Sequence, residues 1–164
     1  MDAAAEDLTA VLPPSAAVLA SRAMLGIVAA SLESALEQVT VPQLRILVVL
    51  VARGPVRAGV LAEETGASPS TLTRTVDRLE RDGWVRRNSA PSSRRETLVV
   101  PTRRAIALVE DVTRRRTEGI ERVLARLSDQ DRAAVVRGFE LFSGAAGEFD
   151  RRRLLGLGIG DERG

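Results

Sequence analysis

The sequence predicts a mainly α-helical protein with one small β-hairpin. Apolar residues recur at spacings of three and four over most of the 164-residue chain, which is the pattern of a helix with one buried face. Glycine and proline interrupt this pattern and divide it into separate helices. Only two short runs, WVRR at 84–87 and TLVV at 97–100, have strand character, and they are close enough in sequence to pair.

The first helix is predicted to follow Pro13-Pro14 and to end near Gln38. Its apolar face is formed by Val18, Leu19, Leu25, Val28, Leu32 and Leu36. A second, mostly buried helix begins at Thr40-Val41-Pro42, because threonine is a common N-cap and proline suits the first helical turn. Gly54-Pro55 ends this helix.

Two short helices are predicted next. The first covers residues 58–65 and is closed by Gly66, and the second starts with Ser68 as N-cap and Pro69 as its first residue. Two short helices joined by a tight glycine-containing turn form a helix-turn-helix. Asp82-Gly83 ends the second helix, and the strands 84–87 and 97–100 follow around a polar loop, 88–95. A hairpin directly after a helix-turn-helix is a wing.

Two further helices complete the predicted chain. Thr102 caps a long amphipathic helix, and Ser128-Asp129-Gln130-Asp131 opens a last helix that carries Phe139 and Phe142. The long helices at both ends present apolar surface that a second copy could bury. The predicted organisation is a flexible tail (1–12), an N-terminal dimerisation helix (13–40), a winged helix-turn-helix domain (41–101), C-terminal dimerisation helices (102–150) and a second tail (151–164).

Composition argues against enzymatic function. The chain contains no cysteine and no histidine, which excludes disulfides, thiol redox sensing, Cys/His zinc sites and histidine-dependent catalysis. Carboxylate pairs such as Glu63-Glu64 lie beside arginines on predicted exposed faces, so we expect solvated charges and neither a metal nor a cofactor. The acidic start, MDAAAED, is unlike a secretory signal, and apolar runs such as 46–52 are short for a membrane span. We therefore expect a cytoplasmic protein.

Positive charge is concentrated in the middle of the chain. Residues 53–104 contain eleven arginines and six acidic residues, a net charge of +5, whereas the other residues contain thirteen arginines and sixteen acidic residues, a net charge of −3. This distribution is expected when only the middle of a chain meets a polyanion.

The helix after Ser68 has the residues of a DNA-reading helix. Leu72, Val76 and Leu79 form one apolar stripe. The other faces carry Ser70, Thr71, Thr73, Arg74, Thr75, Asp77, Arg78 and Arg81. Short hydroxyl side chains allow close approach to a major groove, and arginine can donate to guanine O6 and N7. The alternative is an ordinary solvated helix with an Asp77–Arg81 ion pair.

The wing and its surroundings supply further arginines. Arg94 and Arg95 lie near the predicted tip, where arginines can enter a minor groove. Arg86, Arg87 and Arg57 are candidates for phosphate contacts. Each of them could equally be a solvated surface charge.

The segment from Val41 to Ala105 resembles the MarR family of winged helix-turn-helix transcriptional regulators. The matching motifs are VPQLRILVVL, GPVRAGVLAEETGASPSTLTRTVDRLERDGWVRR and RRETLVV, followed by PT before a long helix. The resemblance implies a homodimer with interlocked terminal helices on double-stranded DNA with a pseudo-palindromic operator. It also implies a repressor, relieved by a small aromatic or anionic effector. By the same resemblance, Ser70, Thr71 and Arg74 would face bases, Thr73 a phosphate and Arg95 the minor groove.

The chain departs from the family pattern at two places. Ser93 stands where the family usually has an aspartate two residues before the wing arginine, so Arg95 lacks that orienting partner. Pro101-Thr102-Arg103-Arg104-Ala105 replaces the usual Leu-Thr-x-x-Gly and keeps only the threonine cap. The altered wing leaves a second hypothesis open, a winged-helix dimer that acts as a protein-interaction module for an acidic partner.

The effector pocket that the resemblance implies has few candidate residues. Arg22, Arg45 and Trp84 are the polar or aromatic choices, since the chain has no tyrosine. Each also has a structural interpretation, Trp84 as a partly buried strand residue and the two arginines as surface or ion-paired groups.

Overall fold

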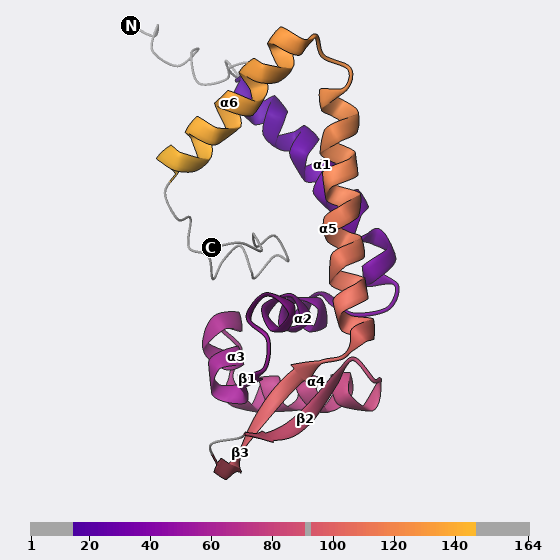
Figure 1. The fold of residues 1–164 in the computed structure, drawn as a ribbon, viewed down its shortest axis with the longest axis vertical. Coiled ribbons are helices and arrows are strands. Elements are labelled where there is room, and N and C mark those ends of the chain that lie inside the picture. Colours follow the sequence, from indigo (N-terminus) through magenta and orange to yellow (C-terminus); the bar gives the residue numbers. More distant parts are fainter. Residues whose placement is uncertain (1–14, 91–92, 147–164) are drawn as a thin grey trace, which may run out of the picture.

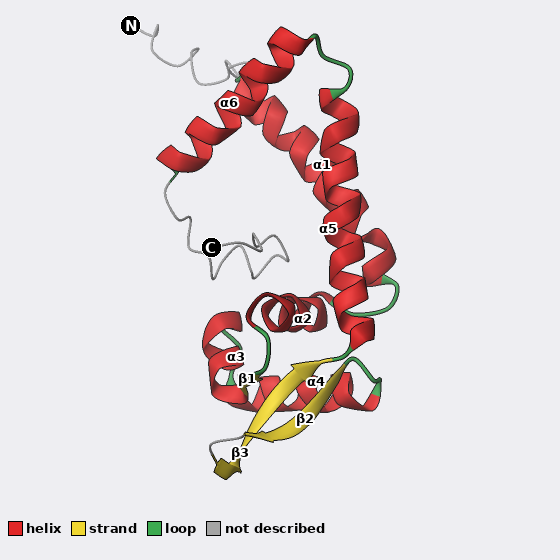
Figure 2. Cartoon of the chain, viewed as in Figure 1, coloured by secondary structure: helices red, strands yellow, loops and turns green. Residues whose placement is uncertain are grey.

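The computed structural model of the chain describes residues 15–90 and 93–146, which form a mainly helical fold with one small sheet (Figures 1 and 2). The predicted tails, 1–12 and 151–164, lie outside the described residues. In chain order the elements are α1 (Ala16–Leu36), α2 (Val41–Arg53), β1 (Val56–Arg57), α3 (Ala58–Thr65), α4 (Pro69–Arg81), β2 (Val85–Ala90), β3 (Ser93–Pro101), α5 (Arg103–Leu124) and α6 (Asp129–Ala145).

The molecule has two regions. One end contains α2, α3, α4 and the three strands, and α5 leads away from it with α1 packed along its length (Figure 1). Gly119 allows α1 and α5 to approach closely, because a Cβ atom at this position would lie 2.7 Å from Cγ2 of Ile27. Helix α6 begins at the far end of α5 and runs in a different direction (Figure 1).

The predicted helix boundaries are confirmed where capping residues set them. In a capping box at the start of α2, the backbone N–H of Thr40 donates to Oε1 of Gln43 at 2.8 Å. Ser68, Thr102 and Ser128 each accept a backbone N–H at the start of α4, α5 and α6. Helix α3 ends at Gly66, whose φ of 63° lies in the left-handed region that glycine enters without a steric penalty.

The wing is longer than predicted. Strands β2 and β3 pair antiparallel from Val85↔Pro101 to Ala90↔Ser93, so most of the expected polar loop 88–95 is strand. The sequence obscured this because the outer wing lacks the apolar alternation that marks a half-buried strand. Strand β1 was also not predicted. It is two residues long, too short to show any period, and it pairs with β3 to give the order β1-β3-β2.

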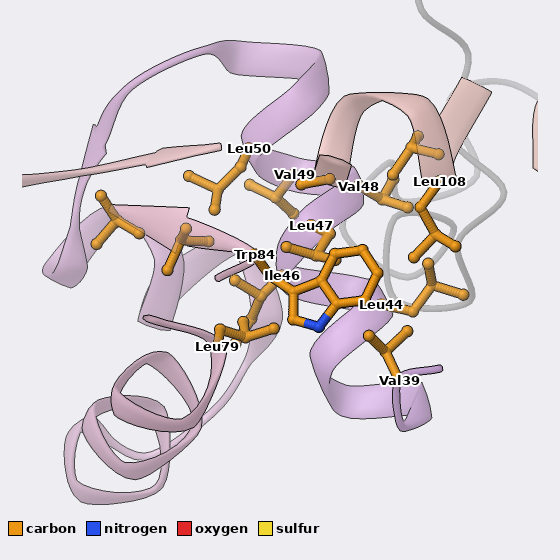
Figure 3. Packing of buried hydrophobic residues seen from close by; sticks show 14 of the residues in the cluster. Val39, Leu44, Ile46, Leu47, Val48, Val49, Leu50, Leu79, Trp84 and Leu108 are labelled. Atoms are coloured by element: carbon orange, nitrogen blue, oxygen red, sulfur yellow. The ribbon is translucent and has the colours of Figure 1, made fainter. Parts of the chain in front are cut away.

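The hydrophobic core surrounds α2 (Figure 3). Leu44 and the run from Ile46 to Leu50 are buried, and they meet the apolar stripe of α4, strand residues of the wing and the first turns of α5. Trp84 fills the space between α2 and the root of the wing and is only 2% exposed. The guanidinium of Arg104 lies over the indole ring, 3.8 Å from its centroid.

The terminal helices are largely uncovered. None of the residues Asp129–Ala145 of α6 is buried, and in α1 only Val28, Ser31 and Ala35 are. Large apolar side chains are exposed on both helices, including Leu25 at 66% and Phe142 at 71%. By length and composition, α1 is also the one helix among the described residues that could cross a membrane. The sequence-based expectation missed this property because it considered only uninterrupted apolar runs.

Candidate nucleic-acid interface

Helix α4 has one buried and one exposed face. Leu72, Val76 and Leu79 are each at most 2% exposed and pack in the core, which confirms the predicted stripe. The exposed polar side chains of this helix are Ser70, Thr71, Thr73, Arg74, Asp77, Arg78 and Arg81. The fold therefore presents to solvent all the residues of α4 that the sequence assigns to DNA.

Hydrogen bonds at the start of α4 determine which hydroxyl groups can donate outward. Ser68 accepts from the backbone N–H of Thr71 at 3.3 Å and donates to the Thr71 hydroxyl at 2.9 Å, which leaves the Thr71 proton available. The Thr73 hydroxyl instead donates to the carbonyl of Pro69 at 2.9 Å. A hydroxyl has a single proton, so Thr73 must release this bond before it can donate to a phosphate.

A groove beside α4 brings its arginines together with α2. It has a volume of about 300 Å³, and its lining residues are Thr40, Pro42 and Gln43 of α2 and Thr71, Arg74, Thr75 and Arg78 of α4. Within the described part of the chain, neither Arg74 nor Arg78 has an ion-pair partner. The sequence did not predict that α2 contributes to this surface, because the approach of α2 to α4 is set by core packing and not by a local pattern.

Arg87 connects the wing to α4. Its guanidinium donates to Oδ1 of Asp77 and to Oε2 of Glu80, each at 2.6 Å, and its backbone N–H donates to Oε1 of Glu80 at 3.1 Å. The hydrogen bond to Asp77 is the largest cause of a raised pKa of Arg87. Asp77 is thus paired with a wing residue and not with Arg81, the i,i+4 partner that the sequence allowed.

The other predicted DNA-binding arginines are spread around α4. Arg86 is exposed on β2, and Arg57 is exposed in β1 at the start of α3. Arg94 and Arg95 lie in β3 near the tip of the hairpin. The side chains of residues 90–96 are outside the described set, so the minor-groove role of these two arginines stays a prediction.

Of the three effector-pocket candidates, Trp84 is next to a cavity. The cavity has a volume of about 270 Å³ and is lined by Gln38, Trp84, Arg104, Ala107, Leu108 and Asp111. It lies where the wing joins α5. Arg22 is exposed on α1, and Arg45 is partly buried on α2 with no hydrogen-bond partner for its Nε. The described residues contain no cluster of acidic side chains that could hold a metal ion.

Comparisons with known sequences point to DNA-binding regulators. A family model described as "MarR family" matches residues 39–97. YfiV of Bacillus subtilis (strain 168), an uncharacterized HTH-type transcriptional regulator, is 31% identical over 106 residues, which cover 65% of this chain and 66% of YfiV. YwoH of the same organism, described in the same words, is 32% identical over 100 residues, which cover 61% of this chain and 72% of YwoH. The chain therefore spans about two thirds of the length of these relatives.

Solved structures share the fold. RV1404 from Mycobacterium tuberculosis superposes with a TM-score of 0.73 at 37% identity, over 81% of this chain and 91% of that one. The transcriptional regulator Tm0710 from Thermotoga maritima gives a TM-score of 0.66 at 25% identity, over 78% and 91% of the two chains. A mutant of MepR from S. aureus, solved bound to an oligodeoxyribonucleotide, gives 0.61 at 18% identity, over 77% and 92%.

Removal of the N-cap of α4 should destabilise the protein. We expect Ser68→Ala to lower the free energy of unfolding by about 0.5–2 kcal/mol, because the backbone N–H of Thr71 loses its acceptor. Ser70→Ala is the matched control and should leave stability within about 0.5 kcal/mol, since Ser70 is exposed and its hydroxyl bonds only to the Ser68 hydroxyl and not to a backbone N–H. Urea unfolding followed by circular dichroism measures both, and equal effects of the two substitutions would contradict the capping role.

Proposed function

The chain belongs to the MarR family of winged helix-turn-helix transcriptional regulators, and we propose that it is a homodimeric repressor that reads a specific DNA sequence. The observation that carries this proposal is the exposed face of α4. Its N-terminal turn offers short hydroxyl side chains, and Arg74 and Arg78 follow without ion-pair partners among the described residues. Unpaired arginines beside small residues suit close contact with base edges and phosphates.

The contacts divide by chemistry. Arg74, with Ser70 and Thr71, faces bases in the major groove, because it follows the small residues by one helical turn. Thr73, Arg78, Arg86 and Arg57 are assigned to phosphates, and Arg94 and Arg95 to the minor groove. The oligonucleotide complex of the MepR mutant supports DNA binding by this fold, since that protein has the same fold and was solved with DNA. The protein acts in the cytoplasm, where the DNA that it regulates is accessible.

A second copy of the chain would cover the uncovered terminal helices. Exposed apolar side chains on α1 and α6, among them Leu25, Phe139 and Phe142, would be buried between protomers. The dimer would then place two α4 helices on a two-fold-related operator. Half-sites about 34 Å apart, one helical turn of DNA, allow both helices to enter successive major grooves on one side of the duplex.

We also propose that a small aromatic or anionic effector relieves repression by occupying the cavity beside Trp84 and Arg104. The cavity lies where the wing meets α5, so a bound molecule there can change the orientation of the wing. Trp84 is the single tryptophan of the chain, and its fluorescence reports on this site alone. Titration with a simple aromatic carboxylate should quench this emission and release DNA. Release of DNA without any change in emission would place the effector elsewhere.

The proposed function is tested by selection from a random duplex library at two salt concentrations. The full-length protein should enrich an inverted repeat with half-sites one turn apart. Binding that shows no motif and disappears at moderate salt would leave only backbone electrostatics. Combined with binding to an acidic protein, that result would favour the interaction module instead.

On the selected duplex, Arg74 and Arg86 should give different losses. Arg74→Ala removes a base contact, so we expect the free energy of binding to weaken by about 1–3 kcal/mol on the selected duplex. The protein should also lose its sequence preference at one base step only. Arg86→Ala removes a phosphate contact, so all sequences should bind more weakly. The salt slope, which is the slope of the logarithm of the binding constant against the logarithm of salt concentration, should decrease in magnitude by about one. Fluorescence anisotropy on selected and scrambled duplexes measures both effects. Equal losses on the two duplexes for Arg74→Ala would refute its base-reading role.

The dimer should depend on the apolar surface of α6. Phe142→Asp places a charge on the most exposed apolar side chain of this helix, so we expect the protein to shift from dimer to monomer in sedimentation velocity. Glu140→Gln on the same helix is the control and should leave the dimer intact. A dimer that persists in Phe142→Asp at micromolar concentration would show that α6 is not part of the interface.

A further inference from the structure

We propose that Arg87 is a positioning residue that locks the wing to the recognition helix α4 and offsets part of the negative charge of two carboxylates of that helix beside DNA. The inference rests on the proposed function, since it concerns how the same surface meets DNA. It gives Arg87 a role different from the phosphate contact that the sequence suggests.

The clamp, formed by Arg87, Asp77 and Glu80, uses both terminal nitrogens of one guanidinium. One terminal nitrogen of the Arg87 guanidinium binds Asp77, and the other binds Glu80, both at 2.6 Å. Glu80 also accepts the backbone N–H of Arg87 at 3.1 Å, so the strand itself is tied to the helix. The contact joins residues seven and ten positions apart, across the end of α4 and the start of β2.

A phosphate contact by Arg87 would be electrostatically unfavourable. A guanidinium that turned away to a phosphate would leave two carboxylates and expose both negative charges on a helix that is proposed to face a polyanion. While the clamp is closed, Arg87 offsets one of the two negative charges of Asp77 and Glu80, and with Arg74, Arg78 and Arg81 the surface of α4 keeps a net positive charge. The clamp therefore keeps the surface of α4 attractive to DNA without using Arg87 as a contact.

The clamp also fixes the direction of the wing. Strand β3 is held in the sheet by both β1 and β2, but beyond Asn88 the hairpin extends away from the core (Figure 2). Arg87 is the last residue of β2 before this extension that is bonded to α4. Helix and wing can reach the major and minor grooves of one site together only if their relative orientation is kept. Surface ion pairs add little to global stability, so the effect should be seen in DNA binding and wing order.

The experiment uses the full-length chain with the variants Arg87→Gln, Asp77→Asn with Glu80→Gln, and all three substitutions together. Arg86→Gln is the matched control, because it removes the same charge from the neighbouring position of β2. Glu80→Gln keeps an acceptor for the backbone N–H and removes only the charge. The chain has no cysteine, so nitroxide labels at Glu63→Cys and Ser89→Cys report the distance between α3 and the wing once labelled protein is diluted with unlabelled protein.

Arg87→Gln should broaden the interlabel distance distribution in free protein and weaken binding to the selected duplex about tenfold, with the salt slope unchanged. Adding the carboxylate substitutions should cause no further loss of DNA binding, because Arg87→Gln alone already removes the clamp. Arg86→Gln should leave the distances unchanged and reduce the salt slope by about one. If Arg87→Gln behaves like Arg86→Gln, the residue is a phosphate contact and the clamp proposal is wrong. If the wild type selects no sequence, the proposed function fails. The distance distributions alone then test whether Arg87 holds the wing against α4.

Discussion

Burial of helix α2 is the constraint on which the rest of the winged helix depends. Helices α1, α3, α4 and α5 and strand β3 all contact it, and Leu47, Val49 and Leu50 are completely buried among them. Because α2 is apolar on most of its circumference, its neighbours must turn their own apolar stripes inward. That requirement fixes the rotation of α4 about its axis. Its hydroxyl groups and arginines face solvent because Leu72, Val76 and Leu79 face α2 and the core.

The arginines near this surface are of two kinds, according to whether they have a partner within the fold. Arg74 and Arg78 line the groove next to α2 and are available to an external anion. Arg87 and Arg104 are engaged within the fold, the first by two carboxylates and the second by the Trp84 ring and the carbonyl of Asp82. A count of arginines in the sequence cannot separate these groups, because the partners come from other elements. In the structure the separation is clear.

Local rules were sufficient for the helix-turn-helix and insufficient for the contacts between elements. The bounds of α3 and α4 follow from Gly66, Ser68 and Pro69, since capping and turn preferences act within a few residues. Strand β1 and the outer wing lacked a local signal, because two-residue strands have no period and the outer wing has no apolar alternation. The contribution of α2 to the groove beside α4 depends on tertiary packing. Helix α6 was predicted from its cap, but its apolar side chains stay exposed in a single copy.

Amide hydrogen exchange of the protein with and without its selected duplex shows most directly whether the face of α4 and the wing together read DNA. If they do, exchange should slow at the N-terminal turn of α4, at the start of α2 and in the β2–β3 hairpin, and the core of α2 should be unchanged. Protection confined to α1 and α6, or no protection at α4, would contradict this role.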